Sequence, residues 1–562
     1  MRLIIIGGVA GGMSAATRAR WLDEGADIIV FEKWPDVSFA NCGLPYFIGG
    51  AIEERDRLLV VTPERLRTRF KLDVRTRSEV TAIDRARRQV TVRDLNTGRA
   101  YAEPYDKLIL APGAEPVRPP IPGIDDPEVY TLRNLQDMDR IHAAAETAAG
   151  ERRALVIGGG FIGLEMAENL TLRGFRVAIA EMLPQVMPPL DAEMVAPVHR
   201  HLAEKGVALF LSNAVQSIER RGACLRATLR DGSVLECEFI VLSIGIRPNT
   251  ALARQAGLEI GETGGIRVDE HMRTSDPDVY AVGDAVESID YVTRRPVLVP
   301  LAGPANRQGR IAADNVCGRD AMFRGVQGTA IVKVFDLAVA NTGAGEKTLA
   351  RLGIPYQKVY VHPGSHAGYY PGAGDLTLKL LFSLEDGCVL GAQAVGTLGV
   401  DKRIDVLATA IQAHMSVFDL EEAELAYAPP YGAAKDPVNM AAFVAANALR
   451  GDVALVHADA VPEGMALLDV RTPGEFAAGH VPCALNIPVD DLRGRLAEVP
   501  RDKSLAVYCG VGLRAYLACR ILDQEGFKTA NLSGGFRTWM QFHPKPGPEA
   551  EQLRKAFTVE SE

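Results

Sequence analysis

Two cysteines, Cys42 and Cys509, lie in sequence settings that indicate sulfur chemistry. Cys42 lies within SFANCGLPY, and Cys509 follows the apolar stretch 505–508 and opens the loop CGVGLR, which ends at Arg514. A cysteine at the end of a strand, before a glycine-containing loop and a helix, presents its sulfur to backbone amides that stabilise a thiolate or persulfide. We therefore predict one sulfur centre in the N-terminal body of the chain and another in a C-terminal module.

The bulk composition is that of a folded, multidomain enzyme. The chain has 562 residues, of which 47% are hydrophobic and 24% charged, and the length predicts roughly three to four domains. A net charge of −9 argues against nucleic acid or an anionic membrane as partner. The eight cysteines show neither paired CxxC metal spacing nor a disulfide framework, so we predict no metal and a reducing compartment. No apolar run is long enough to span a membrane, and a strand starting at residue 3 leaves no room for a signal peptide, so we expect a cytoplasmic protein.

The first 32 residues predict a dinucleotide site. A buried strand over 3–6 leads into a glycine turn and a helix, in which Gly7 and Gly12 match the first and last glycines of the GxGxxG fingerprint and Val9 replaces the middle one. The N-terminus of such a helix binds a pyrophosphate, and Glu32, at the end of the next strand over 28–31, is placed to accept ribose hydroxyls.

A second copy of the motif strengthens this prediction. A strand over 154–157 leads into Gly158, Gly160 and Gly163, so all three glycines are present, and Glu181 ends the following strand over 176–180. Glu181 would repel a 2'-phosphate, which favours NADH over NADPH.

Two further segments, YDKLILAPG with Ala111 and Gly113 and TSDPDVYAVGD with Asp284, complete a set of four motifs in order. With them the chain resembles the flavoprotein disulfide reductases that carry two dinucleotide-binding domains. The resemblance implies an α/β fold with two Rossmann-like domains, one for FAD and one for NAD(P)H, followed by an α+β dimerisation domain, in a homodimer. We place the FAD domain at 1–115 and 245–325, the NAD(P)H domain at 116–244 and the dimerisation domain at 326–445. The implied FAD contacts are Gly7, Gly12, Glu32, Ala111, Gly113 and Asp284, and the implied NADH contacts are Gly158, Gly160, Gly163 and Glu181.

Cys42 lacks the second cysteine of the common CxxxxC redox pair, because Phe47 stands in its place. The partner of the thiol must then be a bound small thiol, a persulfide sulfur or a sulfenic oxygen. SFANCGLPY resembles the coenzyme A disulfide reductases and the related NADH-dependent persulfide and polysulfide reductases. Single-cysteine NADH peroxidases and oxidases carry a histidine in the first glycine turn, where this chain has Ala10.

The same resemblance implies contacts for coenzyme A and a tyrosine pair near the cysteine. Tyr369 and Tyr427 match the family pair that reaches the cysteine across the dimer interface, and Tyr370 and Tyr431 are the alternatives one register away. Arg20 is a further candidate cation for the coenzyme A phosphates. The implied coenzyme A contacts are Ser14, Arg18, Ser38, Asn41, Lys71 and Lys435.

The C-terminal segment resembles a single rhodanese domain. We place a linker at 446–460 and this α/β domain at 461–562, on the segments LLDVRTPGEF, GHV, LAVYC and LSGGF. The C-x4-R loop from Cys509 to Arg514 is one residue shorter than the phosphate-binding C-x5-R loop of tyrosine phosphatases, which favours sulfur. We predict that Arg514 adds positive charge at Cys509, and that Asp469 and Arg471 form a structural ion pair.

These residues together predict an FAD-dependent homodimer that uses NADH to reduce the S–S bond of a coenzyme A persulfide or polysulfide at Cys42, while Cys509 carries sulfane sulfur. Coenzyme A and small thiols or persulfides are then its partners. Three alternatives stay open: a coenzyme A disulfide reductase with an accessory rhodanese, a sulfur-relay or redox-sensing protein, and an NADH oxidase. The direction of sulfur transfer does not follow from the sequence.

Overall fold

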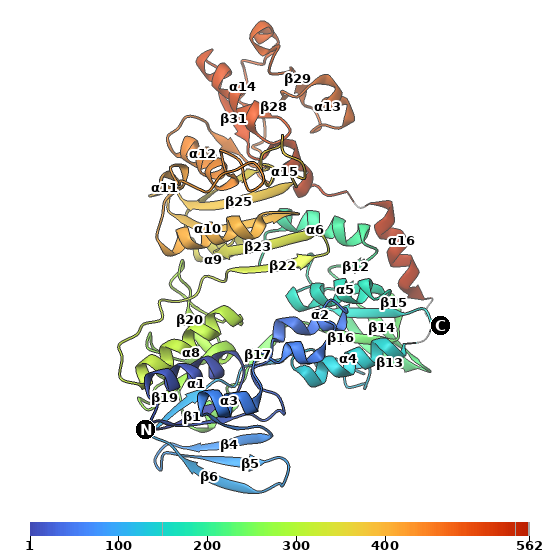
Figure 1. The fold of residues 1–562 in the computed structure, drawn as a ribbon. Coiled ribbons are helices and arrows are strands. Elements are labelled where there is room, and N and C mark those ends of the chain that lie inside the picture. Colours follow the sequence, from blue (N-terminus) through green and yellow to red (C-terminus); the bar gives the residue numbers. More distant parts are fainter. Residues whose placement is uncertain (149, 546, 560–562) are drawn as a thin grey trace. The chain divides into compact units, whose positions relative to one another are not determined.

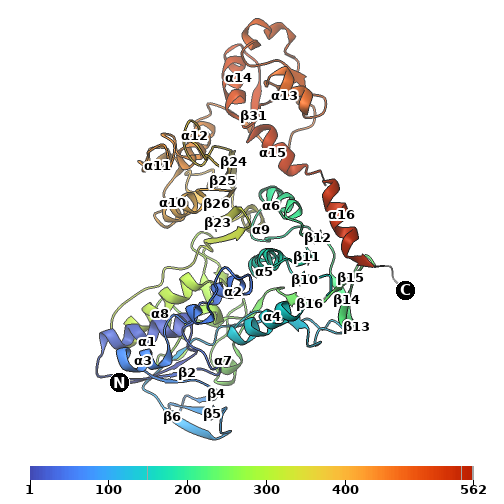
Figure 2. The same cartoon turned by 45° about the vertical axis from the view of Figure 1, so that its right-hand side comes forward.

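The structure is a computed structural model that describes residues 1–148, 150–545 and 547–559. The chain forms two compact units (Figures 1 and 2). Unit 1 comprises Met1–Met182, Phe210–Gly328 and the C-terminal residues from Phe557, and unit 2 comprises Leu183–Leu209 and Thr329–Ala556. Each unit is described by itself below.

The first sheet of unit 1 is parallel, with strand order β19-β7-β1-β2-β3. Its central strands are apolar and buried on both faces, as expected for a parallel sheet covered on both sides. Two helices, α1 (Ala10–Leu22) and α8 (Ala302–Val316), pack against each other beside this sheet. The strands are β1 (Arg2–Ile6), β2 (Asp27–Phe31), β3 (Asp73–Arg75), β7 (Lys107–Leu110) and β19 (Val279–Ala281).

A second parallel sheet of unit 1 repeats this architecture. Strands β11, β10, β16 and β9 lie side by side, and α5 (Phe161–Leu172) follows β10 directly. The two predicted Rossmann-like folds are therefore confirmed. The strands are β9 (Val129–Tyr130), β10 (Arg153–Ile157), β11 (Arg176–Ala180) and β16 (Phe239–Leu242), and the neighbouring helix is α4 (Leu135–Thr147). Antiparallel strands complete the unit, in the ladders β4 (Ser78–Asp84), β5 (Gln89–Asp94) and β6 (Ala100–Pro104), and β13 (Val215–Arg221), β14 (Cys224–Leu229) and β15 (Val234–Cys237).

Unit 2 begins, after the helix α6 (Ala192–Glu204), with an antiparallel sheet of order β22-β23-β26-β25-β24. Helices pack beside this sheet, which confirms the predicted α+β dimerisation domain. The strands are β22 (Ala330–Val334), β23 (Leu337–Gly343), β24 (Tyr356–Val361), β25 (Leu376–Ser383) and β26 (Val389–Gly396), and the helices are α9 (Glu346–Leu352), α10 (Val400–Gln412), α11 (Val417–Glu421) and α12 (Pro437–Leu449).

The last domain of unit 2 has a parallel sheet of order β27-β31-β30-β28-β29. Alternate residues of β30 (Leu505–Tyr508) pack into two separate cores, Val507 with residues of α14 (Leu513–Gln524) and Ala506 with residues of α15 (Gly535–Phe542). Strand β27 (Leu455–Val456) lies within the range predicted as linker and pairs with β31 (Thr529–Leu532). The remaining elements are β28 (Ala466–Asp469), β29 (Leu485–Asn486), α13 (Pro473–Ala478) and α16 (Pro548–Phe557). Among the described residues of the chain, no helix combines the length and the apolar character needed to cross a bilayer.

Candidate functional site

The turn after β1 has the close packing of a dinucleotide cradle. Gly7 has φ +104°, and a Cβ on it would lie 2.0 Å from the carbonyl oxygen of Ala111. A Cβ on Gly12 would lie 1.9 Å from the carbonyl oxygen of Gly7, so neither position accepts a side chain. Val9, at the imperfect middle position, has φ −113°, which any residue adopts. The turn therefore keeps the cradle geometry despite the missing glycine.

The second cradle has the same construction. A Cβ on Gly158 would lie 2.5 Å from the carbonyl oxygen of Ser243, and one on Gly163 would lie 2.0 Å from that of Gly158. Gly160, the N-cap residue of α5, has open space where its Cβ would be, which lets a pyrophosphate approach the backbone closely. Both cradles fit a dinucleotide.

The glutamate that follows each cradle is held in place by hydrogen bonds from the backbone of the glycine turn. Glu32 accepts hydrogen bonds from the backbone N–H of Gly8 (2.8 Å) and of Trp34 (3.0 Å), and Glu181 accepts one from the N–H of Gly159 (2.7 Å). Both side chains are buried. Burial raises the pKa of Glu32 and outweighs the hydrogen bonds from Gly8 and Trp34, which lower it. Because each carboxylate oxygen can accept more than one hydrogen bond, both acids are compatible with a ribose hydroxyl.

The other predicted FAD residues gather at the carboxyl ends of adjacent strands. Ala111 and Gly113 follow β7, and Asp284 lies in a short 3-10 helix, Gly283–Ala285, after β19. Gly113 has φ +67°, and its carbonyl accepts the N–H of Asn249 at 2.9 Å. Burial raises the pKa of Asp284. The strand order β19-β7-β1 thus brings three motifs that are far apart in the sequence to the carboxyl edge of one sheet: the glycine turn after β1, Ala111 and Gly113 after β7, and Asp284 after β19. Open α/β sheets bind their ligands at this edge.

Cys42 lies in a 3-10 turn, Asn41–Gly43, before the short helix α2 (Leu44–Ile48). Solvent reaches its side chain, although protein atoms surround much of it. Burial raises the pKa of the thiol, and the nearby carboxylates of Glu165 and Asp284 raise it further. Since Asp284 belongs to the first cradle and Glu165 to helix α5 of the second, Cys42 lies between the two dinucleotide folds.

Tight packing holds α2 against the second dinucleotide fold. A Cβ on Gly49 would lie 1.9 Å from the side-chain oxygen of Asn169, and Arg173 donates to the carbonyl of Ile48 at 2.7 Å. Phe47, at the second position of the CxxxxC pattern, packs on His142 with ring centroids 5.0 Å apart. Phe47 is thus a packing residue.

Two residues beside Cys42, Tyr46 and Glu165, were missed from the sequence. The Tyr46 hydroxyl donates to Glu165 Oε1 at 3.3 Å, and burial raises the pKa of Glu165 to about 7. Glu165 lies two residues after Gly163 in the second cradle, but only the packing of α2 on α5 shows that it faces the cysteine.

The residues expected to bind coenzyme A lie in different surroundings. On α1, Ser14 donates to Asn306 at 2.5 Å, and Arg18 pairs with Asp314 through two donors (2.9 and 2.7 Å). Arg20 is buried and donates to four backbone carbonyls, so it is not placed to bind a phosphate as we expected. Ser38 has φ 49°. Asn41 is exposed and donates to the Arg133 carbonyl at 3.4 Å. Lys71 and Lys435 are both exposed.

Tyr369 and Tyr427 lie together in unit 2. Their hydroxyls are 2.7 Å apart, both side chains are exposed, and the hydrogen bond with Tyr427 raises the pKa of Tyr369. Tyr370 instead packs its ring edge-on against His366. The pairing therefore favours Tyr369 and Tyr427 over the register-shifted Tyr370 and Tyr431.

The Cys509 centre has the expected strand–loop–helix form. Cys509 directly follows β30, is buried, and its Sγ accepts the backbone N–H of Gly512 at 3.1 Å. Gly512, with φ +106°, is the N-cap residue of α14. The predicted ion pair of Asp469 and Arg471 is confirmed, with the guanidinium donating to both carboxylate oxygens (2.6–3.0 Å). Arg514, however, pairs with Glu475 from α13, so its charge is already compensated.

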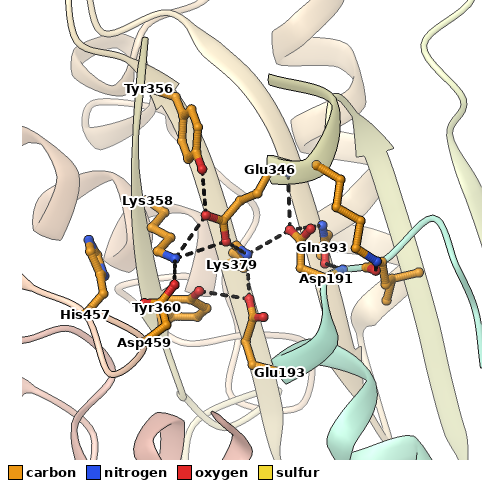
Figure 3. Close-up of polar contacts among 12 residues, drawn as sticks. Asp191, Glu193, Glu346, Tyr356, Lys358, Tyr360, Lys379, Gln393, His457 and Asp459 are labelled. Carbon is orange, nitrogen blue, oxygen red and sulfur yellow. Dashed lines mark hydrogen bonds and ion pairs between the residues drawn. The ribbon is translucent and has the colours of Figure 1, made fainter. Parts of the chain in front are cut away.

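A buried charge cluster in unit 2 was not anticipated (Figure 3). The ammonium group of Lys379, on β25 and fully buried, donates to Asp191 (2.8 Å), Glu193 (2.5 Å) and Glu346. Lys358 joins Glu346 (3.0 Å) to Asp459 (2.9 Å) of the last domain. The three carboxylates are close enough to hold a metal ion, but Lys379 already supplies the compensating charge. The cluster therefore ties the antiparallel sheet to its neighbours.

Comparison with known proteins agrees with this architecture. The family model of the pyridine nucleotide-disulphide oxidoreductases matches residues 1–308, that of their dimerisation domain matches 329–436, and that of the rhodanese-like domain matches 454–542. The chain belongs to the pyridine nucleotide-disulphide oxidoreductase family. It is an oxidoreductase that uses FAD and a pyridine nucleotide and that carries a dimerisation domain and a rhodanese domain.

Individual relatives resemble the chain over most of its length. The coenzyme A disulfide reductase of Staphylococcus aureus (strain JH9) is 37% identical over 445 residues, which are 79% of this chain and 99% of the relative. The structure of reduced Bacillus anthracis CoADR-RHD is 48% identical, with a TM-score of 0.94, over 97% of this chain and 98% of that one. The NAD-dependent persulfide reductase from A. fulgidus is 41% identical, with a TM-score of 0.90, over 96% of this chain and 100% of that one.

Proposed function

We propose that the protein is an NADH-dependent reductase of the S–S bond in coenzyme A persulfide, polysulfide or disulfide, with Cys42 as the single redox cysteine. The observation that carries the proposal is the position of Cys42, which lies between the two dinucleotide folds. The second position of the CxxxxC pattern is Phe47, which packs on His142, so Cys42 has no paired cysteine there. The relatives named as persulfide reductase and CoADR-RHD also align over the rhodanese domain, which supports a combined sulfur function.

The chemistry at Cys42 needs a sulfur from the substrate. The Cys42 thiolate attacks one sulfur of the substrate; the S–S bond breaks, the other sulfur leaves as a thiolate or hydrosulfide, and a new S–S bond to Cys42 forms. FAD, held at the first cradle by Gly7, Gly12 and Glu32, would supply the two-electron relay from NADH that the return of Cys42 to its thiolate requires. Glu165, whose pKa is about 7, lies beside Cys42 and is suited to hold the proton that the thiol releases.

Other residues of the chain have supporting roles in this proposal. Ser14, Arg18, Ser38, Asn41, Lys71 and Lys435 bind coenzyme A. In a homodimer, one hydroxyl of the Tyr369–Tyr427 pair donates to the leaving sulfur, while the other hydroxyl, 2.7 Å away, donates to the first and stabilises the negative charge that develops on it. Cys509 carries sulfane sulfur to or from the same substrate.

Anaerobic NADH oxidation tests the assignment. Coenzyme A persulfide, coenzyme A disulfide and inorganic polysulfide are each supplied to the wild type and to Cys42→Ser, Cys509→Ser and Cys483→Ser. Cys483 is an exposed thiol of the rhodanese domain and serves as the matched control. We expect Cys42→Ser to lose NADH oxidation with every substrate and the other two to keep it with coenzyme A persulfide. Undiminished persulfide reduction by Cys42→Ser would refute the proposal. In a parallel assay in air without a sulfur substrate, oxygen consumption by the wild type that is faster than its anaerobic sulfur reduction would favour an NADH oxidase.

A further inference from the structure

Arg514, the arginine of the C-x4-R loop, forms a bidentate ion pair with Glu475. Arg514 donates from Nη1 to Glu475 Oε2 at 2.8 Å and from Nη2 to Glu475 Oε1 at 2.6 Å. A guanidinium recognises an oxyanion through this same planar fork of parallel donors. Glu475 therefore takes up one donor on each terminal nitrogen of Arg514 and neutralises the charge that Arg514 would otherwise offer to an anionic substrate at Cys509.

Glu475 is itself fixed in place. It lies in the first turn of α13, and its Oε2 accepts the backbone N–H of Thr472 (3.0 Å) and the Thr472 hydroxyl (2.9 Å) in a capping box. The hydrogen bonds from Arg514 are the largest cause that lowers the pKa of Glu475, to about 2. The carboxylate thus stays ionised at any physiological pH, and the pair has no net charge.

The pair lies at the reactive sulfur. Arg514 interacts with Cys509 as well as with Glu475, and both interactions raise the pKa of the guanidinium. Around the buried Cys509, the most exposed residues of the loop and of the first turns of α14 are apolar: Val511, Leu513 and Leu517 are 42%, 59% and 49% exposed. Arg514 is partly exposed between them. The surface at Cys509 therefore combines apolar side chains with the neutral pair of Arg514 and Glu475.

We propose that Glu475 is a specificity-determining residue that makes the Cys509 centre reject dianionic sulfane donors, such as thiosulfate, and accept persulfides on an apolar stem. A dianion would have to approach the carboxylate of Glu475, which already neutralises the guanidinium of Arg514, whereas the uncharged S–SH group of R–S–SH meets no such repulsion. This inference rests on the proposed role of Cys509 as a sulfane carrier.

Both donors undergo the same balanced reaction. The Cys509 thiolate attacks the terminal sulfur of R–S–SH, the donor S–S bond breaks, R–S⁻ leaves, and Cys509 carries the persulfide. With thiosulfate the leaving group is sulfite. Neither transfer needs an oxidant or a reductant, so the two donors differ only in the charge that approaches Glu475.

The test is the thiosulfate:cyanide sulfurtransferase activity of the full-length holoenzyme, compared between wild type, Glu475→Gln and Glu498→Gln. Glutamine keeps a carbonyl oxygen for the capping box. Glu498 pairs with Arg495 in the same domain (2.7 Å), so Glu498→Gln is the matched control. We expect Glu475→Gln to lower the KM for thiosulfate roughly tenfold, because it frees one positive charge at the site. In this variant alone, KM should rise again with added salt.

An unchanged KM for thiosulfate in Glu475→Gln, or no thiosulfate activity in it, would overturn the inference. A fall in KM that is insensitive to salt would also count against it, since a merely structural change does not depend on screening. The proposed function is tested separately, by loading Cys509 from coenzyme A persulfide, which Cys509→Ser abolishes. That test is made on the wild type and Cys509→Ser, so its outcome does not depend on Glu475.

Discussion

Replacing Lys379 by methionine removes the one ammonium group that donates to Asp191, Glu193 and Glu346 while keeping most of the side-chain volume. Lys379 is fully buried, so the variant leaves Asp191 and Glu193 without a cationic partner in a medium that solvates charge poorly, whereas Glu346 keeps Lys358. Breaking a buried ion pair in this way costs roughly 3–5 kcal/mol. For a folded unit of this size, that loss lowers the melting temperature by roughly 6–15 °C.

The stability of the folded protein should fall in acid, because the charge cluster lowers the pKa of Glu346. Burial would raise the pKa of Glu346, but the charges of Lys379 and Lys358 lower it from 4.5 to about 2. The stability that Glu346 contributes is therefore present above pH 4.5 and is lost as the pH falls towards 2; a shift of this size corresponds to roughly 3 kcal/mol. The pKa of Lys379 is raised by the carboxylates, so its own contribution is complete below its ordinary pKa of 10.5 and does not change in acid.

Scanning calorimetry of the full chain at pH 7 and pH 3 measures both effects. We expect a large difference between wild type and Lys379→Met at pH 7 and a smaller one at pH 3, where Glu346 is protonated in the unfolded chain but still ionised in the folded protein, so that its contribution to stability is reduced. Lys333→Met, on the exposed face of strand β22 in the same sheet, is the control. A melting temperature within about 2 °C of the wild type at pH 7, or an equal difference at both pH values, would refute the electrostatic account.

Three further predictions concern the cofactor sites and Cys42. In Gly12→Ala, the new Cβ would lie 1.9 Å from the Gly7 carbonyl oxygen, so the purified protein should lose most of its flavin absorbance. Gly303→Ala is the control: the space at its Cβ is open, so this variant should keep its flavin absorbance. Gly163→Ala should raise the KM for NADH by roughly tenfold or more and leave the flavin content unchanged, because its clash lies in the second cradle. Glu165→Gln removes a carboxylate that raises the pKa of Cys42, so iodoacetamide should alkylate Cys42 several-fold faster near neutral pH; an equal rate in both proteins would contradict this assignment.

The sequence alone predicted the two cradles and the strand–loop–helix at Cys509, because these depend on short stretches of chain. A strand followed by glycines that no side chain can replace is a local requirement, and Gly7 and Gly163 meet it in the structure as the pattern predicted. The order of the motifs likewise predicted the two Rossmann-like folds. Phe47 in the second position of the CxxxxC pattern already indicated a lone redox cysteine.

Only the tertiary structure decided which basic side chains are available to bind an anionic ligand. Arg20 and Arg514 are basic residues beside expected anion sites, yet the first donates to backbone carbonyls and the second is compensated by Glu475, 39 residues away. Likewise, only the packing of α2 on α5 brings Glu165 to Cys42. The physical reason is that the charge of a side chain follows from its type, whereas its partner and its exposure to water depend on long-range packing that no short pattern encodes.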